Sequence, residues 1–471
     1  MIAIEAPKGQ ELLIRHLAEQ FFPDAHQAQR TVRAWELADG ARVEIEPHTG
    51  LCQQSFDYLS PHARRKLRLA LAFAQAALAA GCDLPAYGVL TGVRPTKPAL
   101  TYLGLFGPQQ APRRLQEDYL VALDKARVLV DLAQQETALA ATLKPRDVLL
   151  YVSIPFCPSR CAYCSFISSA APKHLQELPA YLNLLHQELK GLGELCRRQG
   201  LRVRGLYVGG GTPGVLSAQQ IQKLMETLHA NFDLRDAEIT CEIGRPDTVT
   251  EDKLKALKDT GVQRLSINTQ TTDDRVLRVI GRTHTAGQFF DAFALAKSFG
   301  FSSLNVDLIA GLPGEEPQGF LNSLEQVLAL EPENLTVHSF CQKRSADWGK
   351  HRLADRDQAR RMLEESYCRC INRGFRPYYL YRQKNATGAL ENTGFAQPGK
   401  DCFYNVAMME DLLPVLAAGA GGISKIPGPT PQGKIQRLAQ FKYPFEYLAH
   451  PERIPEAHEQ LERLIENLYT E

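Results

Sequence analysis

The sequence has no long apolar run and almost no net charge. No apolar stretch approaches the about 18 residues that a helix needs to cross a bilayer, so we expect no membrane span. With 54 Lys and Arg against 53 Asp and Glu, the formal net charge is +1. Such a chain has no global field to attract nucleic acid, so we expect no nucleic-acid partner.

Features of secreted proteins are also missing. The first residues have neither a basic flank nor an apolar core segment, so we do not expect a signal peptide. Eleven cysteines without regular pairing are typical of a reduced, cytoplasmic protein. At roughly 100–200 residues per domain, the length of 471 residues suggests two or three domains. We expect an accessory domain over 1–145, a core over 146–375 and an extension over 376–471.

From about residue 148 strands alternate with helices, which predicts an α/β fold. Alternating strands and helices require right-handed crossovers and give a parallel sheet. Six such units fit a barrel or partial barrel, with the active site at the carboxyl ends of the strands. The predicted strands are Val148–Ile154, Gly205–Gly209, Ala237–Ile243, Arg264–Thr269, Ser303–Ile309 and Asn334–Phe340.

The flanking regions differ from the core. Apolar residues at helical spacing predict helices over Ser60–Gly81 and within Leu115–Leu143, so the first domain is α-rich or α+β. After about residue 370 we expect an α/β extension. It has a strand at Tyr378–Arg382, a loop at Glu391–Asp401 and a terminal helix at Glu456–Tyr469.

The most informative motif is a run of three cysteines, Cys157, Cys161 and Cys164, which follows the apolar segment Leu149–Phe156. Three thiolates on one tight loop can ligate three irons of a [4Fe–4S] cluster, because soft sulfur ligands suit iron. No fourth cysteine follows within reach, since position 166 is Phe166, so one iron is left open. We expect S-adenosylmethionine (SAM) to bind it through its amino and carboxylate groups. A zinc knuckle and a disulfide pair are the alternatives.

Glycines and polar residues follow the later strands. Three consecutive glycines in Gly209–Pro213 let a ligand approach the backbone and permit positive φ. Glu242 ends the third predicted strand and Gln270 ends the fourth. Asp307 lies inside an apolar strand, where a charge is costly unless it is paired or ligand-bound. A salt bridge with Arg282 is the structural alternative for Asp307.

These motifs together resemble a known family, the oxygen-independent coproporphyrinogen III oxidase group of radical SAM enzymes. The similar segments are Tyr151–Cys164, Gly209–Pro213, Gln270 and Asp307–Pro313. Within this group, Leu90–Lys97 and Tyr379–Asn385 resemble the HemZ branch, the coproporphyrinogen dehydrogenases. The resemblance implies a partial (β/α)6 TIM-like radical SAM barrel.

The resemblance also implies positions for the cofactors. Cys157, Cys161 and Cys164 would hold the cluster. The residues implied to contact the first SAM are Tyr151, Gly210 and Glu242, with Tyr151 also the predicted catalytic residue. The residues that match the second SAM site of the oxidase are Tyr163, Gly211, Thr212, Gln270, Arg282 and Asp307. Cys341 lies near that pocket by position, and Ile423 matches a further adenosine contact. Whether one or two SAM molecules bind stays open.

The implied reaction is the conversion of coproporphyrinogen III propionates to vinyl groups. A radical removes a hydrogen atom from the β-carbon of the propionate, and loss of CO2 and one electron leaves the vinyl. A low-potential donor of flavodoxin or ferredoxin type would supply electrons. Cations near the strand ends would meet the propionates of a tetrapyrrole substrate. The predicted substrate contacts are Arg344, Arg382 and Lys384.

The chain departs from its relatives at several positions. The oxidase has a histidine where this chain has Ser153, and a fourth cysteine where it has Phe166. The haem-chaperone relatives carry a His-Asn-x-x-Tyr-Trp motif where this chain reads Tyr404–Met409, with Met408 or Met409 as the alternative axial ligand. Two other functions therefore stay open. One is radical chemistry on another tetrapyrrole such as haem, including methylation and ring opening. The other is haem binding and delivery.

Overall fold

The computed structural model describes residues 2–22, 30–164, 175–341, 354–383, 390–428 and 434–469. Contacts divide the chain into two compact units. The first unit is Met1–Ala141 with Leu380–Glu391, and the second is Thr142–Tyr379 with Asn392–Glu471. The division into three domains stays a prediction. In the described ranges, no helix is both long enough and apolar enough to span a membrane.

The first unit is an α+β structure. Its sheet has the order β1-β2-β3-β4, with β1 parallel to β2 and the later pairs antiparallel. The strands are β1 (Ile2–Glu5), β2 (Arg30–Glu36), β3 (Ala41–Ile45) and β4 (His48–Cys52). The helices are α1 (Glu11–Phe21), α2 (Pro61–Ala79), α3 (Thr96–Tyr119) and α4 (Leu123–Ala140). Helix α2 corresponds to the predicted helix over Ser60–Gly81 and is capped by Ser60, whose side chain accepts a hydrogen bond from the Ala63 amide.

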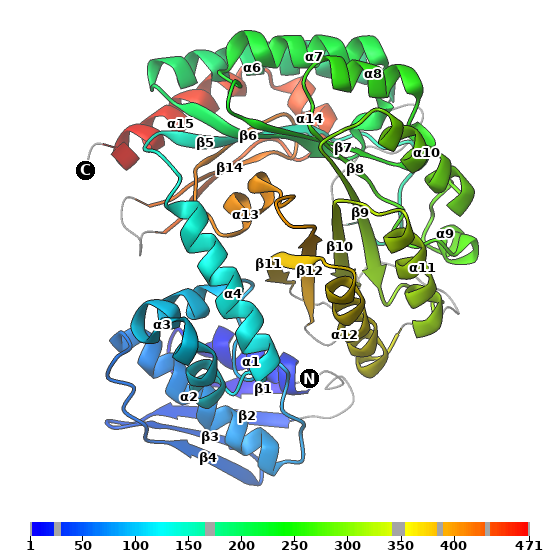
Figure 1. Ribbon diagram of the computed structural model, residues 1–471. Coiled ribbons are helices and arrows are strands. Elements are labelled where there is room, and N and C mark those ends of the chain that lie inside the picture. The colour runs from blue at the N-terminus through cyan, green and yellow to red at the C-terminus, as the bar shows by residue number, and fades with distance from the viewer. Residues whose placement is uncertain are drawn as a thin grey trace. The chain divides into compact units, whose positions relative to one another are not determined.

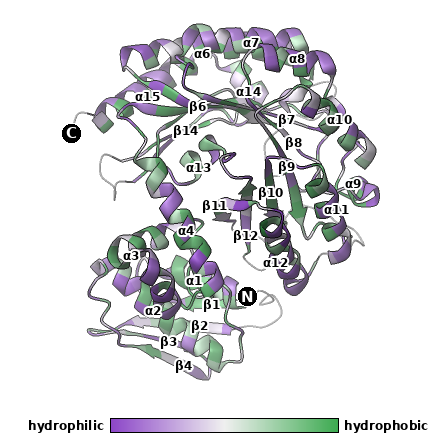
Figure 2. Cartoon of the chain, viewed as in Figure 1, coloured by the Kyte–Doolittle hydropathy of each residue, from purple (hydrophilic) through white to green (hydrophobic). Residues whose placement is uncertain are grey.

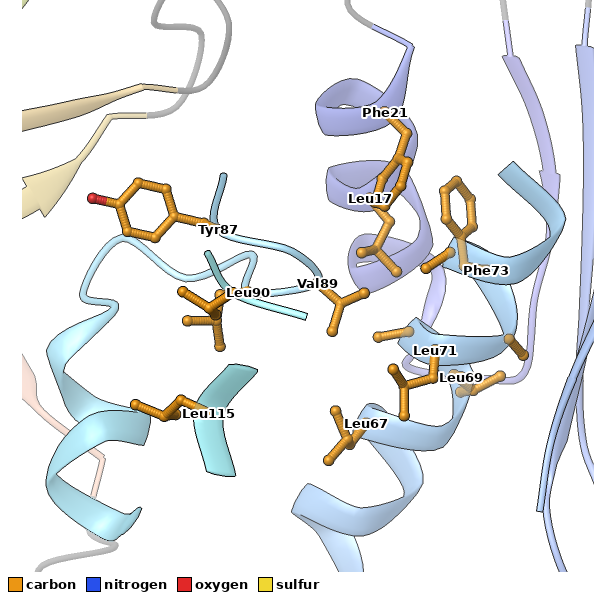
Figure 3. Packing of buried hydrophobic residues seen from close by; sticks show 14 of the residues in the cluster. Leu17, Phe21, Leu67, Leu69, Leu71, Phe73, Tyr87, Val89, Leu90 and Leu115 are labelled. Carbon is orange, nitrogen blue, oxygen red and sulfur yellow. The ribbon is translucent and has the colours of Figure 1, made fainter. Parts of the chain in front are cut away.

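Part of the core of the first unit lies between α1 and α2. Figure 3 shows Phe21 of α1 beside Phe73 of α2, with Leu17 on the same helix as Phe21. The Phe73 ring meets Phe21 edge to face, with 5.6 Å between centroids, and it is fully buried. Aromatic pairs in this geometry contribute beyond their buried area.

Replacing Phe73 by alanine tests this core. A buried Phe→Ala change removes transfer free energy and leaves a cavity, so the free energy of unfolding should fall by about 3–5 kcal/mol. The control is Leu78→Ala on the same helix, where the side chain is exposed and the expected change is about 0.5 kcal/mol or less. Urea denaturation followed by circular dichroism measures both. Equal effects in the two variants would contradict this assignment of the core.

The second unit is built on a long sheet with parallel strands at its centre (Figure 1). The strand order is β11-β12-β10-β9-β8-β7-β6-β5-β13-β14-β15. Strands β5 to β10 run parallel in chain order, which confirms the predicted repeat of six strand–helix units. The parallel strands are β5 (Asp147–Ile154), β6 (Arg202–Gly210), β7 (Glu238–Gly244), β8 (Arg264–Ile267), β9 (Ser303–Ala310) and β10 (Asn334–Ser339). At the edges are β11 (Arg376–Arg382), β12 (Glu391–Ala396), β13 (Val415–Ala418), β14 (Ile423–Ile426) and β15 (Gln436–Ala439).

Helices follow the parallel strands and line one side of the sheet (Figure 1). They are α6 (Leu178–Arg198), α7 (Ala218–Asn231), α8 (Glu251–Asp259), α9 (Asp274–Val279), α10 (Ala286–Ser298), α11 (Pro317–Ala329) and α12 (Arg356–Asn372). Figure 2 shows hydrophobic residues along β9 and β10 and many hydrophilic residues on α6, α7 and α8. Capping boxes at Ser217 and Thr285 begin α7 and α10 and satisfy backbone amides of their first turns.

The prediction of a loop at Glu391–Asp401 is wrong over its first half. Residues Glu391–Ala396 form β12, which is buried throughout and pairs antiparallel with β10. The segment Glu-Asn-Thr-Gly has low β-propensity, so local sequence did not indicate a strand. Tertiary contacts decide the conformation. One of them is a hydrogen bond from the Ser339 amide to the Asn392 side-chain oxygen, at 2.9 Å.

The last part of the chain packs on the parallel sheet through a buried carboxylate. It contains α13 (Phe403–Met409), α14 (Pro444–Ala449) and α15 (Arg453–Tyr469). Glu188 of α6 is 1% exposed and accepts hydrogen bonds from the Gly419 amide at 2.8 Å, the Gln440 side chain at 2.6 Å and the Tyr447 hydroxyl at 2.6 Å. Burial raises the pKa of Glu188 to about 7. These donors stabilise the carboxylate and tie α14 to the segment after β13.

A second buried carboxyl group lies where β9 ends. One oxygen of Glu315 accepts a hydrogen bond from the Thr271 hydroxyl at 2.6 Å, and the other has no hydrogen-bond partner among the described residues. Burial raises the pKa of Glu315 to about 8. The protonated form of Glu315 is therefore favoured in the folded protein. Its hydrogen-bond partner Thr271 directly follows Gln270 in the sequence.

Glu315 should make stability depend on pH. Its folded pKa of about 8 lies above its ordinary value of 4.5, so between these values the folded state binds more protons than the unfolded state. The free energy of unfolding should then fall as pH rises from about 4.5 to 8. The glutamine in Glu315→Gln cannot titrate, so the free energy of unfolding of this variant should decrease less between pH 4.5 and 8. Urea denaturation at pH 5 and pH 8 measures it, with the exposed Glu316→Gln as control. An unchanged slope in Glu315→Gln would exclude this role.

Candidate active site

The cysteine loop leaves the carboxyl end of β5. Cys161 is buried, Cys157 and Cys164 are half-buried, and none of the three is in a disulfide. The loop is anchored by a hydrogen bond from the Ala162 amide to the Ile280 carbonyl at 3.0 Å. In the described ranges, no group of three or more His, Cys, Asp or Glu side chains lies close enough together to hold a single metal ion. Three cysteine thiols on one loop are the donor set of a cluster in which each thiolate binds one iron.

The glycine loop packs directly against this cysteine loop. The Gly211 amide donates to the Ile154 carbonyl at 2.9 Å, and the Thr212 amide donates to the Phe156 carbonyl at 2.7 Å. The Thr212 hydroxyl lies 3.3 Å from Sγ of Cys157 and donates to it. A Cβ on Gly211 would lie 2.5 Å from the Phe156 carbonyl oxygen, so a larger residue would not fit without a shift of the backbone. The two motifs therefore form one structure.

One face of the parallel sheet carries polar side chains from every strand. Residues two apart on a strand share a face, and neighbouring strands are in register. The residues of this polar face are Tyr151, Tyr207, Glu242, Ser266, Asn305, Asp307, Thr336 and His338. Their neighbours in sequence are mostly buried and apolar. The polar face therefore lines the side of the sheet opposite the packed core.

Glu242 is held near the centre of the polar face. It accepts hydrogen bonds from the Tyr207 hydroxyl and the Asn268 amide, each at 3.1 Å. Burial, together with the negative charge of Asp307, raises the pKa of Glu242 to about 7. The Tyr151 ring stacks on Tyr207 with 6.3 Å between centroids. Burial, followed by the charge of Glu242, also raises the pKa of Tyr151.

Asp307 is paired with a histidine that the sequence analysis did not identify. Its Oδ2 lies 3.6 Å from Nε2 of His338, and its Oδ1 accepts from the Asn305 amide at 2.8 Å. Burial acts to raise the pKa of Asp307, but His338 and Asn305 outweigh it and hold the pKa below its ordinary value. The ion pair with Arg282 proposed as the structural alternative does not occur among the described residues. Asp307 is thus an ionised carboxylate on the polar face.

Arg282 and Gln270 lie next to Asn268 and Asp307. Arg282 is 8% exposed, and its Nε and Nη2 donate to the Tyr163 hydroxyl at 3.2 and 2.9 Å. Its Nη1 donates to the Asn268 carbonyl. The Gln270 backbone has a φ of 75° and donates to the Asp307 carbonyl at 2.9 Å. The side-chain oxygen of Gln270 is buried and has no hydrogen-bond partner in the described part of the chain.

The remaining predicted contacts lie elsewhere or cannot be described. Cys341 is half-buried directly after β10, and Ile423 begins β14 with 45% of its surface exposed. Arg344 and Lys384 lie outside the described residues.

Arg382 is buried within the first unit. It donates to the Leu90 carbonyl and to the Gln20 side chain, and its guanidinium lies 4.8 Å from the centre of the Tyr87 ring. These contacts give Arg382 a structural role.

Sequence reasoning missed Tyr207, Asn268 and His338. The available signal was the alternation of polar and apolar residues in Ser-Ile-Asn, Asn-Val-Asp and Thr-Val-His. That alternation indicates a strand with one polar face. The sequence analysis took its candidate site residues mainly from the ends of the strands instead.

Comparison with known proteins identifies the family. The model of the radical SAM superfamily matches residues 151–327. A protein of Bacillus subtilis (strain 168), the oxygen-independent coproporphyrinogen-III oxidase-like protein HemZ, is 37% identical over 372 residues. The alignment covers 77% of this chain and 74% of that protein. The chain belongs to the HemZ family of radical SAM proteins.

Further relatives of this HemZ-family protein include a heme chaperone and a coproporphyrinogen III oxidase. The heme chaperone HemW of Haemophilus influenzae is 28% identical over 305 residues, which is 64% of this chain and 75% of that protein. The solved structure of the coproporphyrinogen III oxidase HemN of Escherichia coli superposes with a TM-score of 0.51. It has 26% sequence identity, and the match covers 69% of this chain and 72% of that chain.

Proteins of the radical SAM family use a [4Fe–4S] cluster and SAM, and the residues present fit both. The cysteine loop offers three thiols that are not in disulfides. The polar face holds the carboxylates of Glu242 and Asp307, and burial, followed by the negative charge of Asp307, raises the pKa of Glu242. A ligand with an ammonium and a sulfonium charge would relieve that repulsion. The unpartnered Gln270 oxygen provides a further acceptor for such a ligand.

Gly211→Ala tests the close contact between the two loops. The added methyl would press on the Phe156 carbonyl and displace the glycine loop from the end of β5, so we expect SAM affinity to fall about tenfold or more. Isothermal titration of the cluster-loaded protein measures it. The control is Gly287→Ala in α10, where a Cβ would meet its nearest neighbour at 3.7 Å. Equal affinity in both variants would show that the loop contact does not shape the SAM site.

Proposed function

We propose that this HemZ-family protein catalyses the oxygen-independent oxidative decarboxylation of coproporphyrinogen III to protoporphyrinogen IX. The observation that carries the proposal is the junction of the cysteine loop, the glycine loop and the polar face at the carboxyl ends of β5 to β10. The likeness to a coproporphyrinogen-III oxidase-like protein over 77% of this chain supports it.

In this proposal Cys157, Cys161 and Cys164 hold the cluster. When bound, the cluster and SAM supply a 5′-deoxyadenosyl radical. Thr212 donates a hydrogen bond to the Cys157 sulfur and so orients one ligand. Ala162, which binds the Ile280 carbonyl, fixes the loop between the ligands Cys161 and Cys164.

The polar face supplies the SAM contacts. Tyr151, Gly210 and Glu242 would contact the SAM that lies on the cluster, and Glu242 would accept from its ammonium group. A second molecule would meet Tyr163, Gly211, Thr212, Gln270, Arg282 and Asp307, with Cys341 beside it and Ile423 as a further adenosine contact. Asp307 already holds His338 at 3.6 Å, so a second cationic ligand would have to share this carboxylate.

The substrate is a tetrapyrrole that carries propionate groups. In each decarboxylation one hydrogen atom leaves the β-carbon, the bond to the carboxylate carbon breaks as CO2 departs, and one electron passes to an acceptor. Cations would hold the propionates, and we propose Arg344 for this role, whereas Lys384 belongs to the segment Leu380–Glu391 of the first unit. Arg282 lies within the described site, and arginine is the kind of side chain that grips a carboxylate with parallel hydrogen bonds. We propose a flavodoxin or ferredoxin as the electron donor and the cytoplasm as the location.

Haem delivery is the second candidate, favoured by the likeness to a heme chaperone. The segment Tyr404–Met409 forms α13, and the Met408 sulfur accepts a hydrogen bond from Lys425 at 3.6 Å. In this alternative the cluster and SAM would be retained while haem binds without turnover.

An anaerobic incubation tests the function. The reconstituted protein is mixed with coproporphyrinogen III, SAM and dithionite, and the porphyrin products are analysed by mass spectrometry. We expect two successive losses of CO2 and two hydrogen atoms. Cys161→Ser should lose iron and product together, whereas Cys368→Ser, at an exposed cysteine on α12, should keep both. Unchanged coproporphyrinogen would contradict the proposal. Stoichiometric haem binding without turnover would then support delivery, and altered haem would support another tetrapyrrole substrate.

A further inference from the structure

We propose that Arg245 is a positioning residue that raises the reduction potential of the cluster through the ligand Cys161. The inference rests on the proposed role of Cys161 as a cluster ligand. It assigns a function to a side chain that lies outside the polar face and is not among the SAM or substrate contacts proposed above.

Arg245 reaches the cysteine loop from the end of β7. It follows Glu242 by three residues, and its side chain is 3% exposed. Its Nη1 donates to the Ser159 hydroxyl at 2.8 Å and lies 4.0 Å from Sγ of Cys161. The guanidinium therefore contacts the loop at the second cysteine, where the side chain of Cys161 is buried.

The other side of the guanidinium is fixed by two partners. Nε and Nη2 donate to the two oxygens of Asp247, at 3.0 and 2.8 Å, and Nη2 also donates to the Thr283 hydroxyl. The Thr283 hydroxyl in turn donates to Asp247 at 2.8 Å. A planar fork held in this way cannot rotate, so its remaining nitrogen keeps its direction toward Ser159 and Cys161.

A fixed cation beside a ligand sulfur changes the energy of the reduced cluster. Reduction adds one negative charge to the cluster, and a nearby guanidinium stabilises that charge more strongly in a water-poor environment. Hydrogen bonds to the sulfur act in the same direction. The carboxylate of Asp247 lies on the far side of Arg245 and partly offsets the cation. The two residues should therefore shift the potential in opposite directions.

The experiment is a redox titration of the reconstituted full chain, followed by electron paramagnetic resonance of the reduced cluster. Arg245→Gln should lower the potential by at least a tenfold change in the reduction equilibrium, which is 59 mV for one electron. Arg245→Lys, which keeps the charge without the fork, should fall between it and the unaltered protein. Asp247→Asn should raise the potential. The control is Arg235→Gln, because Arg235 makes the same two-residue fork with Asp233 on the surface, at 2.8 and 2.7 Å.

Each outcome decides the matter. A potential in Arg245→Gln equal to that of the control, with iron fully retained, would overturn the inference. If Arg245→Gln does not assemble a cluster, Asp247→Asn decides, since a rise supports the inference and no change overturns it. If the protein with all three loop cysteines replaced by serine retains its iron, the proposed function fails at the cluster ligands and the inference falls with it. That result can be distinguished from failure of the inference alone, in which the cluster assembles but its reduction potential is unchanged in Arg245→Gln.

Discussion

The docking of the glycine loop on the end of β5 is the contact on which the site depends. The Gly211 and Thr212 amides reach the carbonyls of Ile154 and Phe156, just before the first cysteine. Because these are backbone hydrogen bonds, they fix the course of both loops without regard to the side chains that each loop carries. The same contact brings the Thr212 hydroxyl to the Cys157 sulfur. The cysteine loop and the glycine loop, which follow successive strands of the sheet, are thereby joined into one structure.

The site combines groups of opposite electrostatic character. On the polar face, Glu242 and Asp307 favour a cationic ligand, whereas Arg245 and Arg282 lie near the cysteine loop and favour negative charge. This separation suits chemistry in which an electron enters at the cluster and a cationic cofactor lies beside it. The arrangement arises because β7 carries Glu242 on one face and Arg245 directly after its end.

The sequence predicted the parallel strands well and their partners poorly. Strands β5 to β10 are short segments rich in Val, Ile and Leu that alternate with amphipathic helices, and this pattern can be seen in the sequence alone. Strand β12 could not be predicted because its Asn and Gly residues form a strand only when β10 is beside them. The prediction that Arg382 contacts the substrate has a different difficulty. Its position near a strand end suggested a substrate contact, but the chain segment Leu380–Glu391 belongs to the first unit, where Leu90 and Gln20 bind the side chain. Sequence distance carries no information on which unit a returning segment joins.

The buried Glu188 has a consequence for the order of events during synthesis. Its donor Tyr447 lies 259 residues further along the chain, and the same carboxylate binds the Gly419 amide. Next to Gly419, the Ala420 carbonyl accepts from the Ser153 hydroxyl at 2.7 Å, one strand residue away from Ile154. The contacts behind β5 are therefore complete only when the chain has been made as far as residue 447, long after the cysteine loop has been synthesised. A chain that ended before Tyr447 would leave the buried Glu188 carboxylate without this donor.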